Sequence, residues 1–255
     1  MSKPKLDTVI KKITFSSDGY TLRGELHLPT TETPPVVIGS HGLFSTRNSP
    51  KQIELAKECN RWGIAFFRFD HRGCGQSNGN FNTVTSLEAR CNDLMSAIKT
   101  IQQRSDIGDK VGLFGSSMGG SVCISVASEL NIDALVTVAA PVLGYTIIDG
   151  LRKPNDSNEL AISLTKKSHL SDITGKLSLL HHILIFHGDS DELIPPSNAL
   201  EIYDKAGDPK KLIMQSNGDH RMSHSKHQEA FIKEAVLWFK NCFEGSLKRT
   251  AKKCS

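Results

Sequence analysis

The chain has 255 residues, of which 38% are hydrophobic and 23% are charged. This composition excludes an intrinsically disordered chain and permits a sizeable core, most simply in one large α/β or all-β domain. The formal net charge is +4 at pH 7, and four basic residues among the last ten equal that excess: Lys248, Arg249, Lys252 and Lys253. The rest of the chain is therefore near neutral, which predicts a basic C-terminal tail over 246–255 and no nucleic-acid partner.

The start of the chain, MSKPKLDTVIKK, contains charges throughout and no apolar stretch of signal-peptide length. No later stretch has the length and apolarity that a membrane-spanning helix needs. The six cysteines are scattered and form no C-x-x-C pair, so we expect free thiols in a reducing compartment. Cys74, between two glycines in RGCGQS, is interpreted as an inert loop thiol rather than a reactive one. These features predict a cytoplasmic protein without a membrane span.

The first elements predict an antiparallel hairpin, because Lys12–Phe15 and Leu22–Leu28 are joined by the turn residues SSDGY. After this hairpin, short apolar runs rich in β-branched residues alternate with amphipathic stretches. The runs typical of buried strands are 36–42 (with its small-residue end), 64–70, 110–115, 134–140, 183–189 and 211–216. Helices are predicted over 50–62, with Ser49 as N-cap and Pro50 at the first helical position, then over 86–103, after Gly119, and over 228–243.

Strands that are apolar on both faces and alternate with helices predict a mostly parallel α/β sheet with helices on both sides, forming a single domain over 1–245. In such sheets ligands bind at the carboxyl ends of the strands. Residues 143–182 are too many for an ordinary connection. They contain the polar cluster RKPNDSNE and the helical pattern ELAISLTKKSHL, and we expect a small cap insertion over the site.

A candidate nucleophile lies in the sequence Gly115-Ser116-Ser117-Met118-Gly119, which matches G-x-S-x-G between a predicted strand and a helix beginning near Met118. At such a sharp turn the central residue, Ser117, has a strained backbone, and the flanking glycines Gly115 and Gly119 avoid side-chain clashes. The following helix N-terminus directs backbone N–H groups toward an anion that forms beside the serine.

A serine hydroxyl needs a base, and the later strands end in loops that offer one. The loop after 183–188 contains Asp189, Asp191 and Glu192, and the loop after the last strand contains His220. Serine, acid and histidine in this chain order form one of the recurring catalytic triads. His41-Gly42 forms a turn after the first parallel strand, and the next amide, that of Leu43, can join the Met118 amide in an oxyanion hole.

The segments SHGLFSTR, FRFDHRGCGQSNG, GSSMGG, HGDSDELIP and NGDH follow one another in the order found in the α/β-hydrolase superfamily, which the chain resembles over nearly its whole length. The small cap and the D-x-R-G-x-G-x-S loop are most similar to those of cinnamoyl/feruloyl-type esterases and related acyl hydrolases. The resemblance implies an α/β-hydrolase fold with Ser117 as nucleophile and His220 as base. The superfamily's H-G-x-x-D pattern begins at His187 and implies Asp191 as the acid, with Asp189 as the alternative.

Two features depart from these relatives. Ser116 stands where many of them have His or another larger residue, and the predicted cap has no aromatic-rich patch that would favour phenolic esters. The expected activity is that of a serine carboxylic ester hydrolase (EC 3.1.1) acting on a small acyl ester, without cofactor or metal. An acyl thioesterase or a small peptidase could use the same triad, and a non-catalytic binding module on the hydrolase scaffold is the alternative of another class.

Other polar clusters are interpreted as structural. His220, His224 and His227 have spacings that zinc sites use, but basic residues lie among them, and the last two are typical of a polar helix start. Asp70, His71 and Arg72 follow a strand, where we expect the carboxylate and the guanidinium to connect backbone segments. His41 is expected to be a buried, hydrogen-bonded histidine rather than a base.

Overall fold

The fold begins with a tight hairpin. In a computed structural model that describes residues 8–143 and 172–246, β1 (Val9–Ser17) pairs antiparallel with β2 (Tyr20–Leu28). The two connecting residues, Asp18 and Gly19, have φ angles of 46° and 82°. Two successive positive φ angles are typical of a type I′ turn, whose twist matches that of paired strands. The predicted hairpin is confirmed, with strands longer than the apolar pattern indicated.

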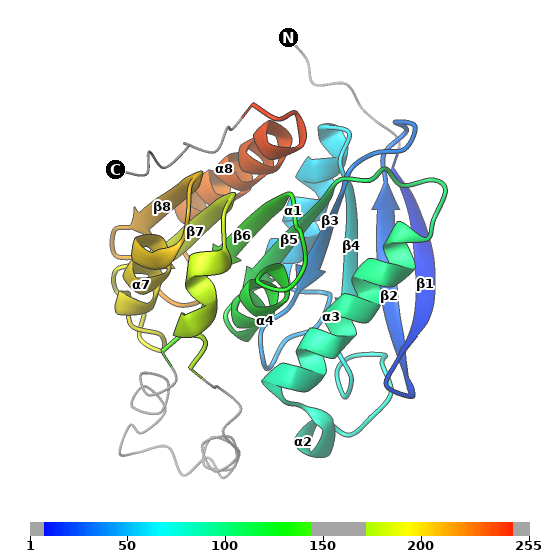
Figure 1. Ribbon diagram of the computed structural model, residues 1–255, viewed down its shortest axis with the longest axis horizontal. Coiled ribbons are helices and arrows are strands. Elements are labelled where there is room, and N and C mark those ends of the chain that lie inside the picture. The colour runs from blue at the N-terminus through cyan, green and yellow to red at the C-terminus, as the bar shows by residue number, and fades with distance from the viewer. Residues whose placement is uncertain (1–7, 144–171, 247–255) are drawn as a thin grey trace.

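The remaining strands form the parallel part of one eight-stranded sheet in the order β1-β2-β4-β3-β5-β6-β7-β8 (Figure 1). Only the pairs β1–β2 and β2–β4 are antiparallel. The further strands are β3 (Val36–Ser40), β4 (Ala65–Asp70), β5 (Val111–Ser116), β6 (Ala134–Val138), β7 (Ile183–Gly188) and β8 (Lys210–Gln215). This mostly parallel sheet with helices on both sides confirms the predicted α/β-hydrolase fold class.

Helices cover both faces of the sheet (Figure 1). One face carries α1 (Pro50–Arg61) and α8 (Ser225–Phe243); the other carries α3 (Leu87–Gln102), α4 (Met118–Ala127), the 3-10 helix η1 (Thr174–Leu179) and α7 (Ser197–Lys205). The sequence did not predict α7 or the single turn α2 (Phe81–Val84), because each is short and buries few apolar side chains. None of the helices in the described residues is both long and apolar enough to cross a membrane.

Helix starts follow local chemistry in part. Ser86 caps α3, since its hydroxyl accepts a hydrogen bond from the Ala89 N–H at 3.0 Å. Ser49 occupies the N-cap position of α1, as predicted, but its side chain makes no capping hydrogen bond. The proline that follows, Pro50, has a fixed φ and no N–H, so the first turn of α1 contains one fewer backbone N–H that needs an acceptor.

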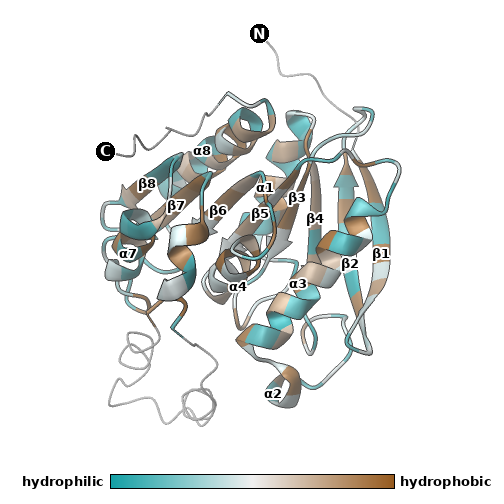
Figure 2. Cartoon of the chain, in the orientation of Figure 1, coloured by the Kyte–Doolittle hydropathy of each residue, from teal (hydrophilic) through white to brown (hydrophobic). Residues whose placement is uncertain are grey.

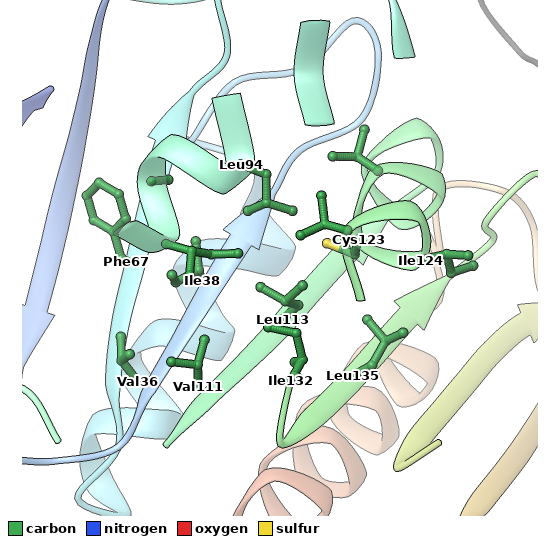
Figure 3. Packing of buried hydrophobic residues seen from close by; sticks show 14 of the residues in the cluster. Val36, Ile38, Phe67, Leu94, Val111, Leu113, Cys123, Ile124, Ile132 and Leu135 are labelled. Carbon is green, nitrogen blue, oxygen red and sulfur yellow. The ribbon is translucent and has the colours of Figure 1, made fainter. Parts of the chain in front are cut away.

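Alternate residues of the central strands face opposite layers, which explains their continuous apolar runs. In β3, Ile38 packs in the layer of α3 and α4, whereas its neighbour Val37 packs in the layer of α1 and α8. Figure 3 shows the first layer, where Leu113 of β5 lies with Leu94 of α3 and Cys123 of α4. The central strands are accordingly coloured hydrophobic in Figure 2, while α3 also carries hydrophilic residues.

Residues 144–171 and 247–255 lie outside the described residues, and with them most of the predicted cap, including its helical pattern, and nearly all of the predicted basic tail. The described end of the predicted insertion, 172–182, packs on the sheet layer. Ile173, Leu177 and Leu180 are buried there, and the Ile173 N–H donates to the Val142 carbonyl at 3.1 Å.

Three buried histidines are in the neutral form: His27 in β2, His41 directly after β3 and His71 directly after β4. Burial lowers the pKa of His27 and of His71 to about 4, and it lowers the pKa of His41 well below its ordinary value. His27 Nε2 accepts a hydrogen bond from Arg68 Nε at 2.8 Å. His41 Nε2 accepts from the His71 backbone N–H at 3.1 Å, while His41 Nδ1 lies 2.8 Å from the Gly42 carbonyl. Each acceptor role requires an unprotonated nitrogen.

These histidines predict acid sensitivity between pH 6.5 and pH 4. In that window the unfolded chain binds protons that the folded chain does not, so the free energy of unfolding should fall as the pH falls, by at most about 1.4 kcal/mol per pH unit for each histidine. The variant His27→Gln keeps an acceptor for Arg68 but cannot titrate, so urea unfolding should show a smaller loss between pH 7 and pH 5 than in the wild type. An identical loss in both proteins would contradict this assignment.

Candidate active site

Ser117 lies in a strained turn between β5 and α4. Its φ and ψ angles are 54° and −129°, a region that non-glycine residues seldom adopt. The Ser117 N–H donates to the Val138 carbonyl of the neighbouring strand β6 at 2.8 Å. Because this contact fixes the backbone, the side chain projects from the carboxyl end of the sheet, where the sequence places the nucleophile.

The glycines beside Ser117 permit three backbone segments to pack closely. A Cβ atom added at Gly115 would lie 2.2 Å from the Gly119 carbonyl oxygen, and one added at Gly119 would lie 2.1 Å from the carbonyl oxygen of Ser40. Real Cβ atoms do not approach backbone this closely. The two glycines therefore provide clearance between β5, α4 and the end of β3, rather than around the serine side chain itself.

Two later loops bring a histidine and a carboxylate to Ser117. His220, after β8, places its Nε2 atom 3.1 Å from Ser117 Oγ. Its other ring nitrogen, Nδ1, lies 2.9 Å and 3.1 Å from the two carboxylate oxygens of Asp191, after β7. The Asp191 side chain is completely buried, whereas that of His220 is 13% exposed. The serine, the histidine and the acid thus form one continuous hydrogen-bonded chain.

The surroundings of Asp191 keep its carboxyl group ionised. Burial by itself would raise the pKa of Asp191, but hydrogen bonds from His187 and His220 and from backbone amides outweigh it, so the pKa lies well below its usual range. The backbone donors are the N–H groups of Leu193 and Ile194, at 2.9 Å and 2.8 Å. A permanent negative charge therefore faces His220 Nδ1.

The neighbouring acids in this loop have other partners. Asp189 Oδ1 accepts hydrogen bonds from the Asn217 N–H at 2.7 Å and from the Ser190 hydroxyl at 2.9 Å, and within residues 8–143 and 172–246 it makes none to His220. Glu192 Oε2 accepts from the His220 backbone N–H at 3.1 Å. The sequence identified Glu192 only as a candidate acid, but the structure shows that it anchors the histidine loop.

Two backbone N–H groups beside Ser117 lack an acceptor among the described residues. A Cβ atom added at Gly42 would lie 3.5 Å from Ser117 Cβ, which places the Gly42–Leu43 peptide next to the serine. Neither the Leu43 N–H nor the Met118 N–H donates a hydrogen bond in the described part of the chain. Unsatisfied backbone donors at this position can receive an anion that forms on a substrate bound to Ser117.

A second Ser-His-Asp arrangement lies behind the first and is sealed from solvent. Ser40 Oγ lies 2.9 Å from His71 Nε2, and His71 Nδ1 lies 3.3 Å from Asp93 Oδ2. All three residues are fully buried. The pKa of His71 is lowered to about 4, and burial is the largest cause of this shift. No substrate reaches this serine, so the arrangement is structural.

The charged residues after β4 also connect loops. Asp70 accepts hydrogen bonds from the backbone N–H groups of Arg47 and Gln76, at 2.8 Å and 3.0 Å. Arg72 donates to both Asp93 Oδ1, at 2.7 Å, and the Ser17 hydroxyl, at 3.1 Å. These contacts join the loops after β3 and β4 to the hairpin and to α3, in agreement with the structural role predicted for Asp70 and Arg72.

The histidines near His220 have other partners in the structure. The described residues contain no group of three or more His, Cys, Asp or Glu side chains that could hold a metal ion. His224 Nδ1 instead accepts a hydrogen bond from the Lys226 N–H at the start of α8. Cys74 is only 7% exposed, and burial raises the pKa of its thiol, which keeps it protonated.

Comparisons with known proteins agree with the fold and give the family. A model of the family described as serine aminopeptidase, S33, matches residues 31–169, more than half of the chain. A mitochondrial palmitoyl-protein thioesterase of Bos taurus is 26% identical over 220 residues, covering 74% of this chain and 67% of that protein. Two solved structures share the fold: an esterase of Pyrococcus furiosus (TM-score 0.80, 17% identity, 93% and 92% of the two chains) and a Butyrivibrio proteoclasticus protein with bound ferulic acid (TM-score 0.74, 19% identity, 91% and 99%).

The close packing at Gly119 predicts a strong position dependence of glycine replacement. In an ordinary helix Gly→Ala stabilises by about 1 kcal/mol, but in Gly119→Ala the new Cβ would clash with the backbone carbonyl of Ser40. We expect a net destabilisation of roughly 1–3 kcal/mol in urea unfolding. Gly175→Ala in η1 is the matched control, since no atom lies within 4 Å of the added Cβ, and it should change stability little. Equal effects of the two variants would contradict the packing.

Proposed function

The chain belongs to the serine aminopeptidase S33 family of α/β-hydrolases, and from this premise we propose that it is a serine-dependent carboxylic ester hydrolase working through an acyl-enzyme. One observation carries the proposal: the hydrogen-bonded chain from Ser117 through His220 to Asp191, with the serine on a strained strand-to-helix turn. The proposed substrate is a small acyl ester, and the reaction needs no metal or cofactor.

The acid–base half of the reaction uses the imidazole of His220. As Ser117 Oγ attacks the ester carbonyl carbon, His220 Nε2 accepts the hydroxyl proton. Asp191 holds the other ring nitrogen in its N–H form and stabilises the positive charge that develops on the ring. Since the pKa of Asp191 lies well below its usual range, the carboxylate stays ionised and does not take the proton.

The electrophilic half uses backbone groups. As the tetrahedral intermediate forms, its oxyanion would accept hydrogen bonds from the N–H groups of Leu43 and Met118. Met118 is the first residue of α4, so the positive end of the helix dipole adds to the stabilisation. The intermediate collapses by expelling the alcohol, which takes the proton from His220 Nε2, and Ser117 remains acylated.

The second step, hydrolysis of the acyl-enzyme, repeats this chemistry with water as the nucleophile. His220 accepts a proton from a water molecule that attacks the acyl carbon, and a second tetrahedral intermediate forms over the same two amides. When it collapses, the proton passes from His220 to Ser117 Oγ. The carboxylic acid leaves, and the serine is regenerated.

The same machinery could cleave acyl thioesters, and the thioesterase among the similar proteins favours this as the second candidate. The two bonds share one tetrahedral intermediate and differ mainly in the leaving group. The description of the family points to amide bonds as a third, more demanding substrate. Matched oxoesters, thioesters and amino-acid anilides with one acyl group, assayed side by side, would rank the three.

A fluorophosphonate should add its mass to Ser117 and to no other serine, because within residues 8–143 and 172–246 only this hydroxyl is both partly exposed and within hydrogen-bonding distance of a histidine base. Ser117→Ala should lose labelling and lower the rate on nitrophenyl acetate by a thousandfold or more while keeping the wild-type melting temperature. Ser116→Ala is the matched control and should retain activity. Folded wild-type protein that neither labels nor turns over ester would identify a non-catalytic binding module instead.

The two neighbouring aspartates should differ sharply. Asp191→Asn cannot fix the tautomer of His220 and should lower kcat on the order of 10⁴-fold. Asp189→Asn, which changes a carboxylate that contacts Asn217 and Ser190, should stay within a few-fold of the wild type. Steady-state kinetics of the two variants at pH 8 decides between them, and the reverse order would assign the acid to Asp189.

A further inference from the structure

Arg90 contacts the oxyanion loop from below. It lies in the first turn of α3, and none of its surface is exposed. Its Nη1 atom donates to the carbonyls of His41 and Gly42, both at 3.2 Å, and its Nη2 atom donates to the Leu43 carbonyl at 3.0 Å. One guanidinium group therefore donates hydrogen bonds to three successive carbonyl groups of the loop that follows β3.

Because a peptide unit is planar, the direction of the Gly42 carbonyl determines the direction of the Leu43 N–H. The Gly42 carbonyl and the Leu43 N–H belong to the same planar, trans peptide unit, so they point in opposite directions. The Gly42 carbonyl oxygen also lies 2.8 Å from His41 Nδ1 and accepts from the Ser45 N–H at 3.3 Å, so Arg90 is the donor to it that comes from outside the loop. With the carbonyl directed toward these donors, the Leu43 N–H points away from them. A Cβ atom added at Gly42 would lie 3.4 Å from the Ser116 carbonyl oxygen and 3.5 Å from Ser117 Cβ, so this peptide unit lies beside the nucleophile. Only Arg90 among these donors also binds the carbonyls on either side of Gly42, so the guanidinium helps to fix the orientation of the Leu43 N–H beside the nucleophile.

In the part of the chain that the structure describes, the charge of Arg90 has no ion-pair partner that would explain its burial. No salt bridge of this side chain occurs within residues 8–143 and 172–246, and its Nε atom has no hydrogen-bond partner there. Asp93, one turn further along α3, is instead bonded to Arg72 and His71. The remaining contact of Arg90 is the hydrogen bond from its Nη2 atom to Cys74 Sγ at 3.4 Å, and a thiol sulfur is a weak acceptor. Burial of a cation is costly, and here carbonyls of one loop provide almost all of its compensation.

We propose that Arg90 is a positioning residue for the proposed ester hydrolysis: by binding the carbonyls of residues 41–43 it holds the Leu43 N–H in the orientation of an oxyanion donor. It touches neither substrate nor triad. The inference rests on the proposed function, and it concerns the transition state alone. Loss of Arg90 should lower kcat and leave KM nearly unchanged, because the ground-state ester carbonyl makes little use of these donors.

A thionoester separates positioning from general stability. In a thionoester the carbonyl oxygen is replaced by sulfur, so the tetrahedral intermediate bears a larger anion that is a poor hydrogen-bond acceptor. An intact oxyanion site favours the oxoester, and a disordered one loses that preference. Partial unfolding or a slower His220 lowers both rates by the same factor, so only displaced donors change the ratio of the two rates.

The experiment compares Arg90→Lys and Arg90→Met with the matched control Arg72→Lys, a buried arginine of the adjoining network that does not contact the oxyanion loop carbonyls. Each is assayed on one oxoester and its thiono analogue, with active sites counted by fluorophosphonate. In Arg90→Met we expect a 10²–10³-fold lower kcat on the oxoester, the cost of one oxyanion donor, with a much smaller loss on the thionoester. Arg90→Lys reaches fewer carbonyls and should fall between wild type and Arg90→Met. Arg72→Lys should keep the wild-type ratio.

The outcomes separate the two proposals. A wild-type protein that hydrolyses no ester refutes the proposed function. A wild type that hydrolyses esters, with Arg90 variants that keep the wild-type oxo-to-thiono ratio, refutes the role of Arg90 alone. If Arg90→Met does not fold, Arg90→Lys, which keeps the charge and most of the volume, decides by the same ratio.

Discussion

The site depends on the contact between the β5–α4 turn and the backbone at the end of β3. Gly119 packs against the carbonyl of Ser40 at a distance that leaves no space for a methyl group, and Gly42 lies against Ser116 and Ser117. This contact brings the first residue of α4 and the Gly42–Leu43 peptide unit next to Ser117. The parallel sheet supplies it, because β3 and β5 are neighbouring strands whose carboxyl ends lie at one edge.

Water access, rather than hydrogen-bond geometry, distinguishes the two Ser-His-Asp arrangements. Both have a serine hydroxyl near one ring nitrogen and a carboxylate near the other. In the buried one, low dielectric surroundings keep His71 neutral, and its contacts connect β3, β4 and α3. His220 is partly exposed, and its serine stands on a turn at the sheet edge. Identical residue types thus serve the frame in one case and are available for chemistry in the other.

The sequence predicted the strands of the sheet and the longer helices, because each has a clear hydrophobic period. It also placed Ser117, His220 and Asp191 in loops that the structure brings within hydrogen-bonding distance. It missed α2, a four-residue turn with no buried side chain, and α7, nine residues long with Ala199 and Ile202 as its buried apolar side chains. It also missed the anchoring contact of Glu192, which depends on tertiary packing. For Arg90 a signal existed: with Leu94, Ala97 and Ile101 it continues the buried stripe of α3, where an arginine is out of place. What the arginine binds could not be read, since its partners are carbonyls 47 to 49 residues away.

The chemistry of the site is divided between two parts of the fold. In the proposed reaction the groups that would move protons come from the loops after β7 and β8, whereas the groups that would bind the oxyanion come from the ends of β3 and β5 and the helices behind them. The second part rests on buried hydrogen bonds that Arg90 donates to the loop carbonyls and that His41 accepts from the His71 backbone N–H, and it therefore has little freedom to rearrange. Donors that are already oriented cost no reorganisation when negative charge develops, which is the condition for strong electrostatic stabilisation. Burial of the Arg90 guanidinium lowers the stability of the fold, but its hydrogen bonds to the loop carbonyls supply this rigidity. The proposed need for fixed dipoles in the transition state therefore explains why a destabilising buried arginine occurs here.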